Sequence, residues 1–244
     1  MKVQHDKVWF TSDLHFWHKN ICKYCNRPYE NVEEMNRAII DNWNSVVNDD
    51  DYAFVLGDLG FCGISKLKPM IAELKGHIFI IQGNHDNDKL INSLYYDRVI
   101  YGFDKLLSLT VIEEDGSEQE MTLCHFPMTE WYNSERGSWM IHGHCHQLPD
   151  TPSYSLKHWD VGVDKNNMFP ISYKQLKTNI VNQIVNEMRI QVEAYDNKLT
   201  WETKHDDLDI NEMLDIWEKL MIALTYHPDS IKRAIVEKAE EYAE

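Results

Sequence analysis

The chain has 244 residues, of which 43% are hydrophobic and 26% are charged, an ordinary composition for a globular protein. Its formal net charge is −16, which argues against a long nucleic acid as partner because such binding relies on a basic surface. No apolar run approaches the roughly 18 residues that cross a bilayer, and the first residues form no apolar signal segment, so we expect a cytoplasmic protein without membrane contact.

The first half of the chain alternates strand and helix patterns. Three short apolar runs predict buried strands, at residues 7–12, 52–56 and 77–82. From Val32 the apolar residues recur at helical spacing, and Asn31 with Glu34 predicts an N-cap and a capping box. A second helix is expected over 65–74. This alternation is typical of an α/β fold, in which ligands bind beyond the carboxyl ends of the strands.

The second half begins with strands and ends in helical patterns. Strand-like runs occur at residues 106–112, 120–125, 139–142 and 158–163. After about residue 173 the chain has no glycine, and five apolar residues four apart predict one amphipathic helix from Leu176 to Val192. Two more helices are expected near 211–224 and 228–242. We therefore predict a main domain over 1–175 and a helical extension over 176–244, which would pack on the domain or form a homo-oligomer.

Residues that commonly bind metals follow several of the predicted strands. They are Asp13 and His15, Asp58, Asn84 and His85, His125, and His144 and His146. Carboxylate, imidazole and amide groups suit first-row divalent ions better than calcium. The five cysteines lack a framework spacing and are interpreted as reduced thiols.

The order of these residues is more specific than any single one. Asp-x-His, Gly-Asp, Gly-Asn-His-Asp, His and Gly-His-x-His, in this order, resemble the calcineurin-like metallophosphoesterases over roughly residues 7 to 175. The segments FTSDLHFWHKNI and NRPYENVEEMN resemble a subgroup of small bacterial and phage phosphoesterases. The resemblance implies a four-layer α/β/β/α sandwich with two facing mixed sheets, here followed by the C-terminal helical extension.

The resemblance also implies a role for each matched residue. Two divalent ions would share Asp58, the first also bound by Asp13, His15 and His146 and the second by Asn84, His125 and His144. Manganese is the expected ion, with iron, zinc, nickel, cobalt or magnesium as alternatives. His85 would contact the phosphate and protonate the leaving oxygen, and Asp86 would orient His85 by a hydrogen bond. The implied nucleophile is a hydroxide that bridges the two ions.

Several residues near these segments have two interpretations. His18, Asn20 and Arg27 lie just beyond the first strand, where they could contact substrate; Arg27 suits bidentate phosphate binding. The alternative is that Arg27 and His18 only fix a loop. Trp17 and Trp131 could stack on a nucleobase or lie in the core. Many relatives carry a second acid three residues after the aspartate of Gly-Asp, where this chain has Phe61.

The leading interpretation of the sequence is a hydrolase of small phosphoesters. A phosphodiester, such as a cyclic nucleotide, is favoured over a phosphomonoester. A metal-dependent nuclease is one alternative, and the acidic charge argues against it. A scaffold of the same fold without activity is the other, and the retention of all the matched positions argues against that.

Overall fold

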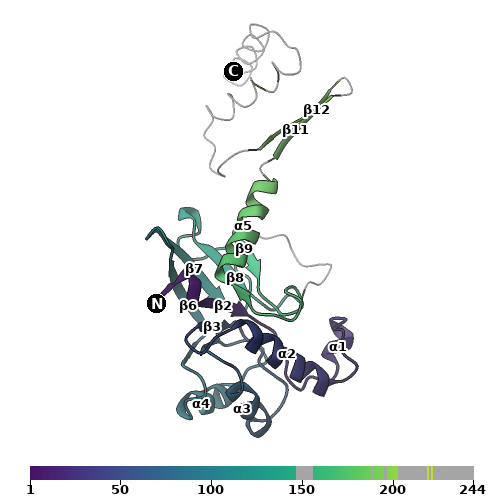
Figure 1. Cartoon of the computed structure of the whole chain (residues 1–244), viewed down its shortest axis with the longest axis vertical. Helices are drawn as coiled ribbons and strands as arrows, with labels where there is room; N and C mark the ends of the chain where they lie inside the picture. The colour runs from purple at the N-terminus through teal and green to yellow at the C-terminus, as the bar shows by residue number, and fades with distance from the viewer. Residues whose placement is uncertain (147–155, 188, 195–196, 203–218, 220, 222–244) are drawn as a thin grey trace, which may run out of the picture. The chain divides into compact units, whose positions relative to one another are not determined.

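The computed structural model describes residues 1–146, 156–187, 189–194, 197–202, 219 and 221 (Figure 1). The chain forms two compact units, residues 1–180 and 181–244. The domain boundary expected after residue 175 stays a prediction. Among the described helices, none is both long and apolar enough to cross a membrane.

The first sheet of the first unit has the strand order β10-β2-β3-β4-β5. Its four strands from β2 to β5 are parallel, and the short β10 pairs antiparallel with β2. The strands are β2 (Val8–Thr11), β3 (Tyr52–Val55), β4 (His77–Ile81), β5 (Gly102–Asp104) and β10 (Ile171–Ser172). The predicted strands over 7–12, 52–56 and 77–82 are thus confirmed, whereas the shorter β5 and β10 were not predicted.

The second sheet has the order β1-β6-β7-β8-β9. Strands β6 and β7, which match the strand-like runs at 106–112 and 120–125, pair antiparallel, and β7, β8 and β9 are parallel neighbours. The strands are β1 (Lys2–Gln4), β6 (Leu106–Ile112), β7 (Glu118–Cys124), β8 (Trp139–His142) and β9 (His158–Asp160). Both sheets are therefore mixed, and each contains at least three parallel strands side by side.

Helices cover the outer face of each sheet (Figure 1). Buried residues of α2, α3 and α4 share one core cluster with Ala53, Val55, Ile78 and Ile80 of the first sheet. At the second sheet, Tyr173 at the start of α5 stacks on Trp139 of β8. The helices are α1 (Ile21–Tyr24), α2 (Val32–Val46), α3 (Ile64–Ala72), α4 (Asp88–Tyr96) and α5 (Tyr173–Glu187), with short turns η1 (His5–Lys7) and η2 (Ser134–Arg136). The predicted four-layer sandwich is confirmed.

Three phenylalanines hold the parallel strands of the first sheet in register on the face opposite the helices. Phe10, Phe54 and Phe79 are paired in the strand register. Their rings lie 5.8 Å apart between Phe10 and Phe54, and 5.3 Å apart between Phe54 and Phe79. Phe10 and Phe54 are fully buried, and burial of each such side chain contributes about 1.5–3 kcal/mol. This fixed register sets the height at which each strand ends.

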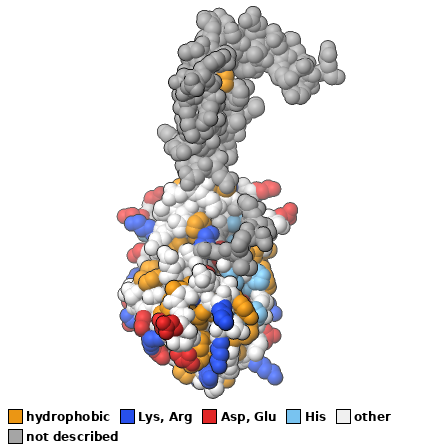
Figure 2. Space-filling view, turned by 90° about the vertical axis from the view of Figure 1, so that its right-hand side faces the viewer, with side chains coloured by type: hydrophobic (Ala, Val, Ile, Leu, Met, Phe, Trp, Pro, Cys, Tyr) orange, Lys and Arg blue, Asp and Glu red, His pale blue; other side chains and the backbone are white. Residues whose placement is uncertain are grey.

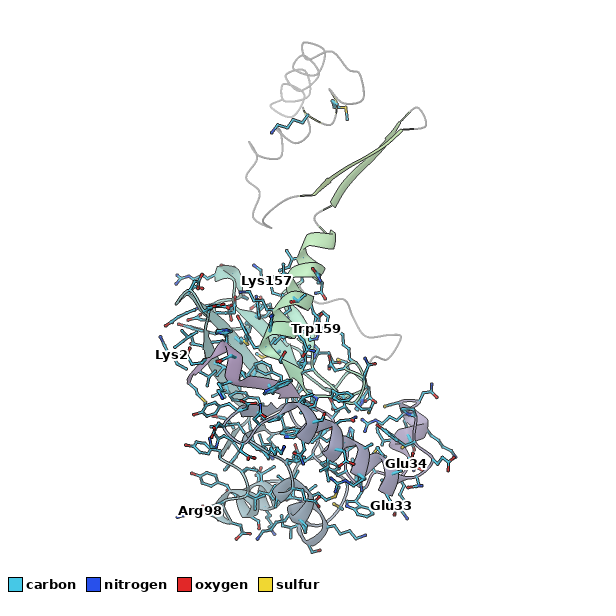
Figure 3. The ribbon with its side chains drawn as sticks, viewed as in Figure 1. Lys2, Glu33, Glu34, Arg98, Lys157 and Trp159 are labelled. Carbon is cyan, nitrogen blue, oxygen red and sulfur yellow. The ribbon has the colours of Figure 1, made fainter. Side chains whose placement is uncertain are left out.

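The predicted N-cap of α2 is confirmed at Asn31, whereas the return bond of the capping box is shifted by one residue. Asn31 Oδ1 accepts a hydrogen bond from the Glu34 backbone N–H at 2.8 Å. The Glu34 carboxylate accepts in turn from the backbone N–H of Glu30 at 3.0 Å, rather than from that of Asn31. Glu33 and Glu34 thus lie at the start of the helix (Figure 3), where negative charge is favourable.

The C-terminal part corrects one prediction. The helix expected from Leu176 to Val192 ends at Glu187, and β11 (Arg189–Ala194) pairs antiparallel with β12 (Asn197–Glu202). Apolar residues of 189–194 also alternate with period two, and the register places Ile190 opposite Trp201. When a short segment fits both the helical and the strand periodicity, the presence of a strand that can pair with it determines which structure it adopts. The helices expected near 211–224 and 228–242 lie outside the described residues, apart from two single positions.

Candidate metal centre

The residues singled out in the sequence lie at the carboxyl ends of five strands from the two sheets, and a further residue that the sequence did not indicate, Asp164, follows a sixth. Strands β2, β3 and β4 lead into the Asp13, Asp58 and Asn84 segments, and β7, β8 and β9 lead into the His125, His144 and Asp164 segments. The loops of the two sheets are joined by hydrogen bonds. The Val163 N–H donates to the Ser12 carbonyl at 3.1 Å, and the His144 N–H donates to Asp13 Oδ2 at 2.9 Å.

The residues expected to hold the first ion converge. The Nε2 atoms of His15 and His146 lie 3.2 Å apart. Asp13 Oδ1 lies 3.6 Å from His146 Nε2 and 4.0 Å from His15 Nε2. Burial, with His146 next in importance, lowers the pKa of His15 to about 2. The ring of His15 is therefore neutral near pH 7, as a metal ligand must be.

The residues expected to hold the second ion lie beside them. His125 Nε2 is 2.9 Å from Asn84 Oδ1 and 3.7 Å from Asp58 Oδ1. The His144 ring centre is 5.1 Å from that of His125. The other carboxylate oxygen of Asp58, Oδ2, lies 3.7 Å from His15 Nε2. The two oxygens of Asp58 therefore face the two groups of ligands.

An unpartnered buried oxygen tests whether these residues fit a metal ion. Asp13 is fully buried, and its Oδ2 accepts the His144 backbone N–H at 2.9 Å. Its Oδ1 has no hydrogen-bond partner among the described residues, which is costly for a buried carboxylate. Burial raises the pKa of Asp13 to about 6. A divalent cation held by Asp13, His15 and His146, whose ligand atoms lie close together, would satisfy this oxygen, so the residues fit the ion.

A buried ion pair supports His146. Asp164 Oδ2 lies 2.7 Å from His146 Nδ1, and an ionised carboxylate only accepts, so Nδ1 donates. Arg27 donates to Asp164 through Nε at 2.7 Å and Nη2 at 2.9 Å. Burial alone would lower the pKa of His146, but the bond to Asp164 raises it to about 10. Asp164 thus fixes the ring so that Nε2 faces the other ligands.

This pair decides between the two interpretations of Arg27. The residue is 5% exposed, and it also donates to the backbone carbonyls of Leu14 at 3.0 Å and Asp13 at 2.8 Å. Its donors are engaged in holding the loop that carries Asp13 and His15. The substrate contact expected of Arg27 is therefore corrected to a structural role.

Asp86 has a different role from the one implied by the resemblance. Its carboxylate accepts the backbone N–H groups of Asp58 at 2.8 Å, Leu59 at 2.9 Å and Gly83 at 2.9 Å. No hydrogen bond from His85 reaches it among the described residues. Because three backbone N–H groups donate to its carboxylate, Asp86 fixes the loops after β3 and β4 to each other, which differs from the predicted bond to His85.

His85 lies at the open side of the centre. Its side chain is 44% exposed, and its Nε2 is 3.9 Å from Asp58 Oδ2. His18 contacts the same region, with its ring centre 5.5 Å from that of His15. Asn20 is exposed at the start of α1, and no side-chain cap bond is formed there. Figure 2 shows histidine side chains reaching the surface on one face of the first unit, with hydrophobic side chains beside them.

Comparison with known proteins decides the family. The family model described as calcineurin-like phosphoesterase matches residues 6–238. This chain belongs to the calcineurin-like phosphoesterase family. Membership implies metal-dependent hydrolysis of phosphoesters, in agreement with the resemblance seen in the sequence and with the clustered ligand residues.

Similar proteins occur in an archaeon, a phage and a bacterium, and their names identify no substrate. An uncharacterized protein of Methanocaldococcus jannaschii is 34% identical over 188 residues, which cover 75% of this chain and 94% of that protein. The gene 66 protein of Mycobacterium phage L5 is 29% identical over 57% of this chain and 77% of its own. A crystal structure of a protein of unknown function from Aquifex aeolicus shares the fold, with a TM-score of 0.53, 22% identity, and coverage of 70% of this chain and 97% of that chain.

The phosphoesterase centre is built on strained backbone. Five of the seven expected ligands have left-handed φ angles, namely Asp13 (57°), His15 (51°), Asp58 (56°), His144 (72°) and His146 (51°). Such conformations cost energy and cluster at functional sites. The preceding glycines allow the loops to approach closely. A Cβ at Gly143 would lie 2.6 Å from Asp13 Oδ2, and one at Gly83 would lie 2.7 Å from the Asp58 nitrogen.

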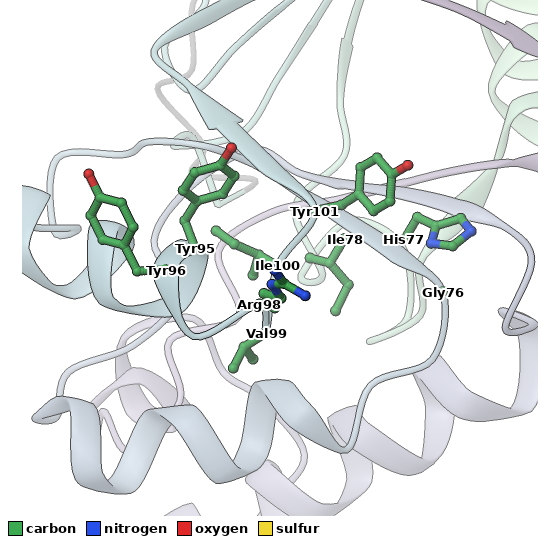
Figure 4. Close-up of a pocket in the computed structure, with 9 residues that line it drawn as sticks. All are labelled: Gly76, His77, Ile78, Tyr95, Tyr96, Arg98, Val99, Ile100 and Tyr101. Atoms are coloured by element: carbon green, nitrogen blue, oxygen red, sulfur yellow. The ribbon is translucent and has the colours of Figure 1, made fainter.

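The indole nitrogens of Trp131 and Trp17 are both bound within the fold of the phosphoesterase, and its surface pocket lies elsewhere. Trp131 is 9% exposed, and its Nε1 donates to the Ser138 carbonyl, so it is a core residue and does not stack on a ligand. Trp17 is partly buried, and its Nε1–H donates a hydrogen bond to Met70 Sδ. A surface pocket of about 600 Å³ includes His77, Tyr96 and Tyr101 (Figure 4). It lies where β4 and β5 begin, at the sheet edge opposite the ligands.

Proposed function

We propose that this phosphoesterase binds two divalent ions and hydrolyses small phosphodiesters, with nucleotide-type diesters, including cyclic ones, as the expected class. The observation that carries the proposal is the position of Asp58. Its two carboxylate oxygens face separate groups of ligands, Oδ2 toward His15 and Oδ1 toward His125. A carboxylate shared in this way is what a two-ion site requires.

Manganese is the expected ion, with iron, zinc, nickel, cobalt and magnesium as alternatives, since imidazole, carboxylate and amide donors together suit first-row divalent ions. When bound, two such ions would supply charge neutralisation on the phosphoryl group and an activated water. The protein's own contribution is to fix the ligands. Asp164 holds His146 through Nδ1, and the Leu56 carbonyl accepts from His125 Nδ1 at 2.7 Å. Each ring therefore presents Nε2 toward the centre before any ion binds.

His85 is proposed to protonate the leaving oxygen. It is a partly exposed histidine directly beside Asp58, with its backbone N–H donating to Asp58 Oδ1 at 3.0 Å. This bond fixes the backbone while the ring remains accessible to a ligand. General acid catalysis of this kind contributes about 10²–10⁴-fold to a rate.

The test is hydrolysis by metal-free protein with manganese, nickel, magnesium or zinc added. Bis-p-nitrophenyl phosphate should be hydrolysed in a metal-dependent manner and faster than p-nitrophenyl phosphate. His85→Ala should slow a diester with a poor alkyl leaving group by about 10²-fold or more, and a p-nitrophenyl diester less, because p-nitrophenolate leaves without a proton.

The outcomes separate the alternatives. Turnover of the monoester alone would contradict the diester preference, and equal loss with both leaving groups would contradict the role of His85. Absence of both turnover and stoichiometric metal would indicate a scaffold. A salt-sensitive gel shift with DNA, together with its cleavage, would favour the nuclease, although the net charge of −16 argues against it.

A further inference from the structure

Two exposed phenylalanines flank the metal centre. Phe61 is 47% exposed and Phe126 is 44% exposed. The Phe61 ring centre lies 4.7 Å from that of His85 and 5.9 Å from that of His15. The Phe126 ring centre lies 4.8 Å from that of His144 and 5.0 Å from that of His125.

The two rings lie against different ligand groups. The partners of Phe61 include His15, which faces Asp58 Oδ2, and the partners of Phe126 include His125, which faces Asp58 Oδ1. Each expected ion therefore has one exposed phenylalanine beside its histidines. A single exposed apolar residue is ordinary on a protein surface, but two that each contact ligand histidines on both sides of a shared carboxylate indicate a common use.

The loops that carry the rings are fixed rather than free. The Phe61 backbone N–H donates to the Phe16 carbonyl at 2.8 Å, and the bridge between Phe16 and Gly60 continues the pairing. Phe126 directly follows His125, whose ring is held by the Leu56 carbonyl. Rings on fixed backbone lose little conformational freedom when a ligand covers them, which favours binding.

We propose that Phe61 and Phe126 bind the two organic groups of a phosphodiester, and that the preferred substrate carries a flat aromatic group on each side of phosphorus. This rests on the proposed function, because it places the phosphoryl group between the two ligand groups. A diester has two substituents on phosphorus and a monoester has one, so two flanking rings match the diester. Flat groups are favoured because aromatic pairs in offset or edge contact gain affinity beyond the area they bury.

The test measures binding of three phosphinate anions that cannot be hydrolysed and that carry two, one or no rings. Diphenylphosphinate, methylphenylphosphinate and dimethylphosphinate are titrated calorimetrically into the manganese-loaded full chain. Each ring should raise affinity by about five- to tenfold, as expected for one aromatic contact. Phe61→Ala and Phe126→Ala should each lower the affinity for diphenylphosphinate by about five- to tenfold and leave the affinity for dimethylphosphinate unchanged.

Matched variants separate recognition from structure. Phe61→Tyr and Phe126→Tyr keep the ring and should bind diphenylphosphinate as the unaltered chain does. Tyr96→Ala removes a ring that is 76% exposed and lines the distant pocket, and it should change nothing. Equal affinity for the three anions would overturn the proposal. So would Phe→Ala variants that weaken all three anions alike, because that loss would report a damaged centre.

The phosphinates also separate this inference from the proposed hydrolysis. A graded affinity without turnover of any diester would leave the ring sites standing and overturn the hydrolytic function. Metal-dependent turnover of diesters with equal affinity for the three anions would support the hydrolytic function and overturn the ring sites.

Discussion

His146 and His125 carry out the same expected task with different support. His146 Nδ1 donates to Asp164, which is itself bound by Arg27, so a buried ion pair holds the ring. His125 Nδ1 donates to the Leu56 carbonyl in the loop after β3. One ligand depends on two charges 137 residues apart in the chain, and the other depends on backbone whose position the sheet already fixes.

The difference shows where the centre is vulnerable. A backbone carbonyl cannot be removed by a side-chain substitution, and it carries no charge that needs a partner. Substitution of either member of a buried ion pair destabilises the fold, because the other charge then stays buried without a partner. The first ion site should therefore be the more sensitive of the two.

The largest expected effect is on stability. Asp164→Ala leaves the Arg27 guanidinium buried without its carboxylate, which should lower the free energy of unfolding by about 3–5 kcal/mol. Urea denaturation of metal-free protein at pH 7 measures this. The control is Lys68→Ala, which breaks the exposed pair with Asp97 and should cost no more than about 1 kcal/mol. Similar losses for the two variants would remove the contrast between the buried and exposed pairs.

The next effect separates the two ion sites. Asp164→Asn keeps the size of the side chain but weakens the hold on His146, so the affinity of the first ion should fall about 10–100-fold. Asn84→Ala removes a ligand expected for the second ion and should lower the affinity for that ion instead. Calorimetric titration with manganese resolves the two steps. If both variants weaken the same step, the assignment of ligands to two ions is wrong.

The smallest effect is in the pH dependence. Burial raises the pKa of Asp13 to about 6, so its protonated form stabilises the metal-free fold at low pH, and this contribution is lost as pH rises through about 6. Ion binding needs the carboxylate. Manganese affinity should therefore rise at least about tenfold between pH 5 and pH 7. Release of the proton on His146, whose pKa is raised to about 10, acts in the same direction.

Thermal unfolding with and without manganese checks the sign of this effect. The increase in melting temperature on adding manganese should be larger at pH 7 than at pH 5, because an ion that binds more tightly stabilises the folded state more at the same ion concentration. An equal or larger increase at pH 5 would show that Asp13 is already ionised in the metal-free fold.

The sequence by itself determined the features that depend on neighbouring residues. Apolar runs predicted β2, β3 and β4, and Asn31 predicted the start of α2, because side-chain periodicity and capping act over a few residues. Ligand-type residues just after these runs predicted a shared edge, since parallel strands end on the same side of a sheet. The family followed from the order of those residues.

Only the tertiary structure decided which distant groups meet. Nothing near Arg27 in the sequence indicates Asp164, and Asp86 is adjacent to His85 in the chain yet bonds to backbone N–H groups. The end of α5 at Glu187 depended on the strand that pairs with residues 189–194. Local sequence patterns predict the secondary structure that each segment prefers. Burial, charge pairing and strand pairing depend on contacts between distant segments, which only the folded chain brings together.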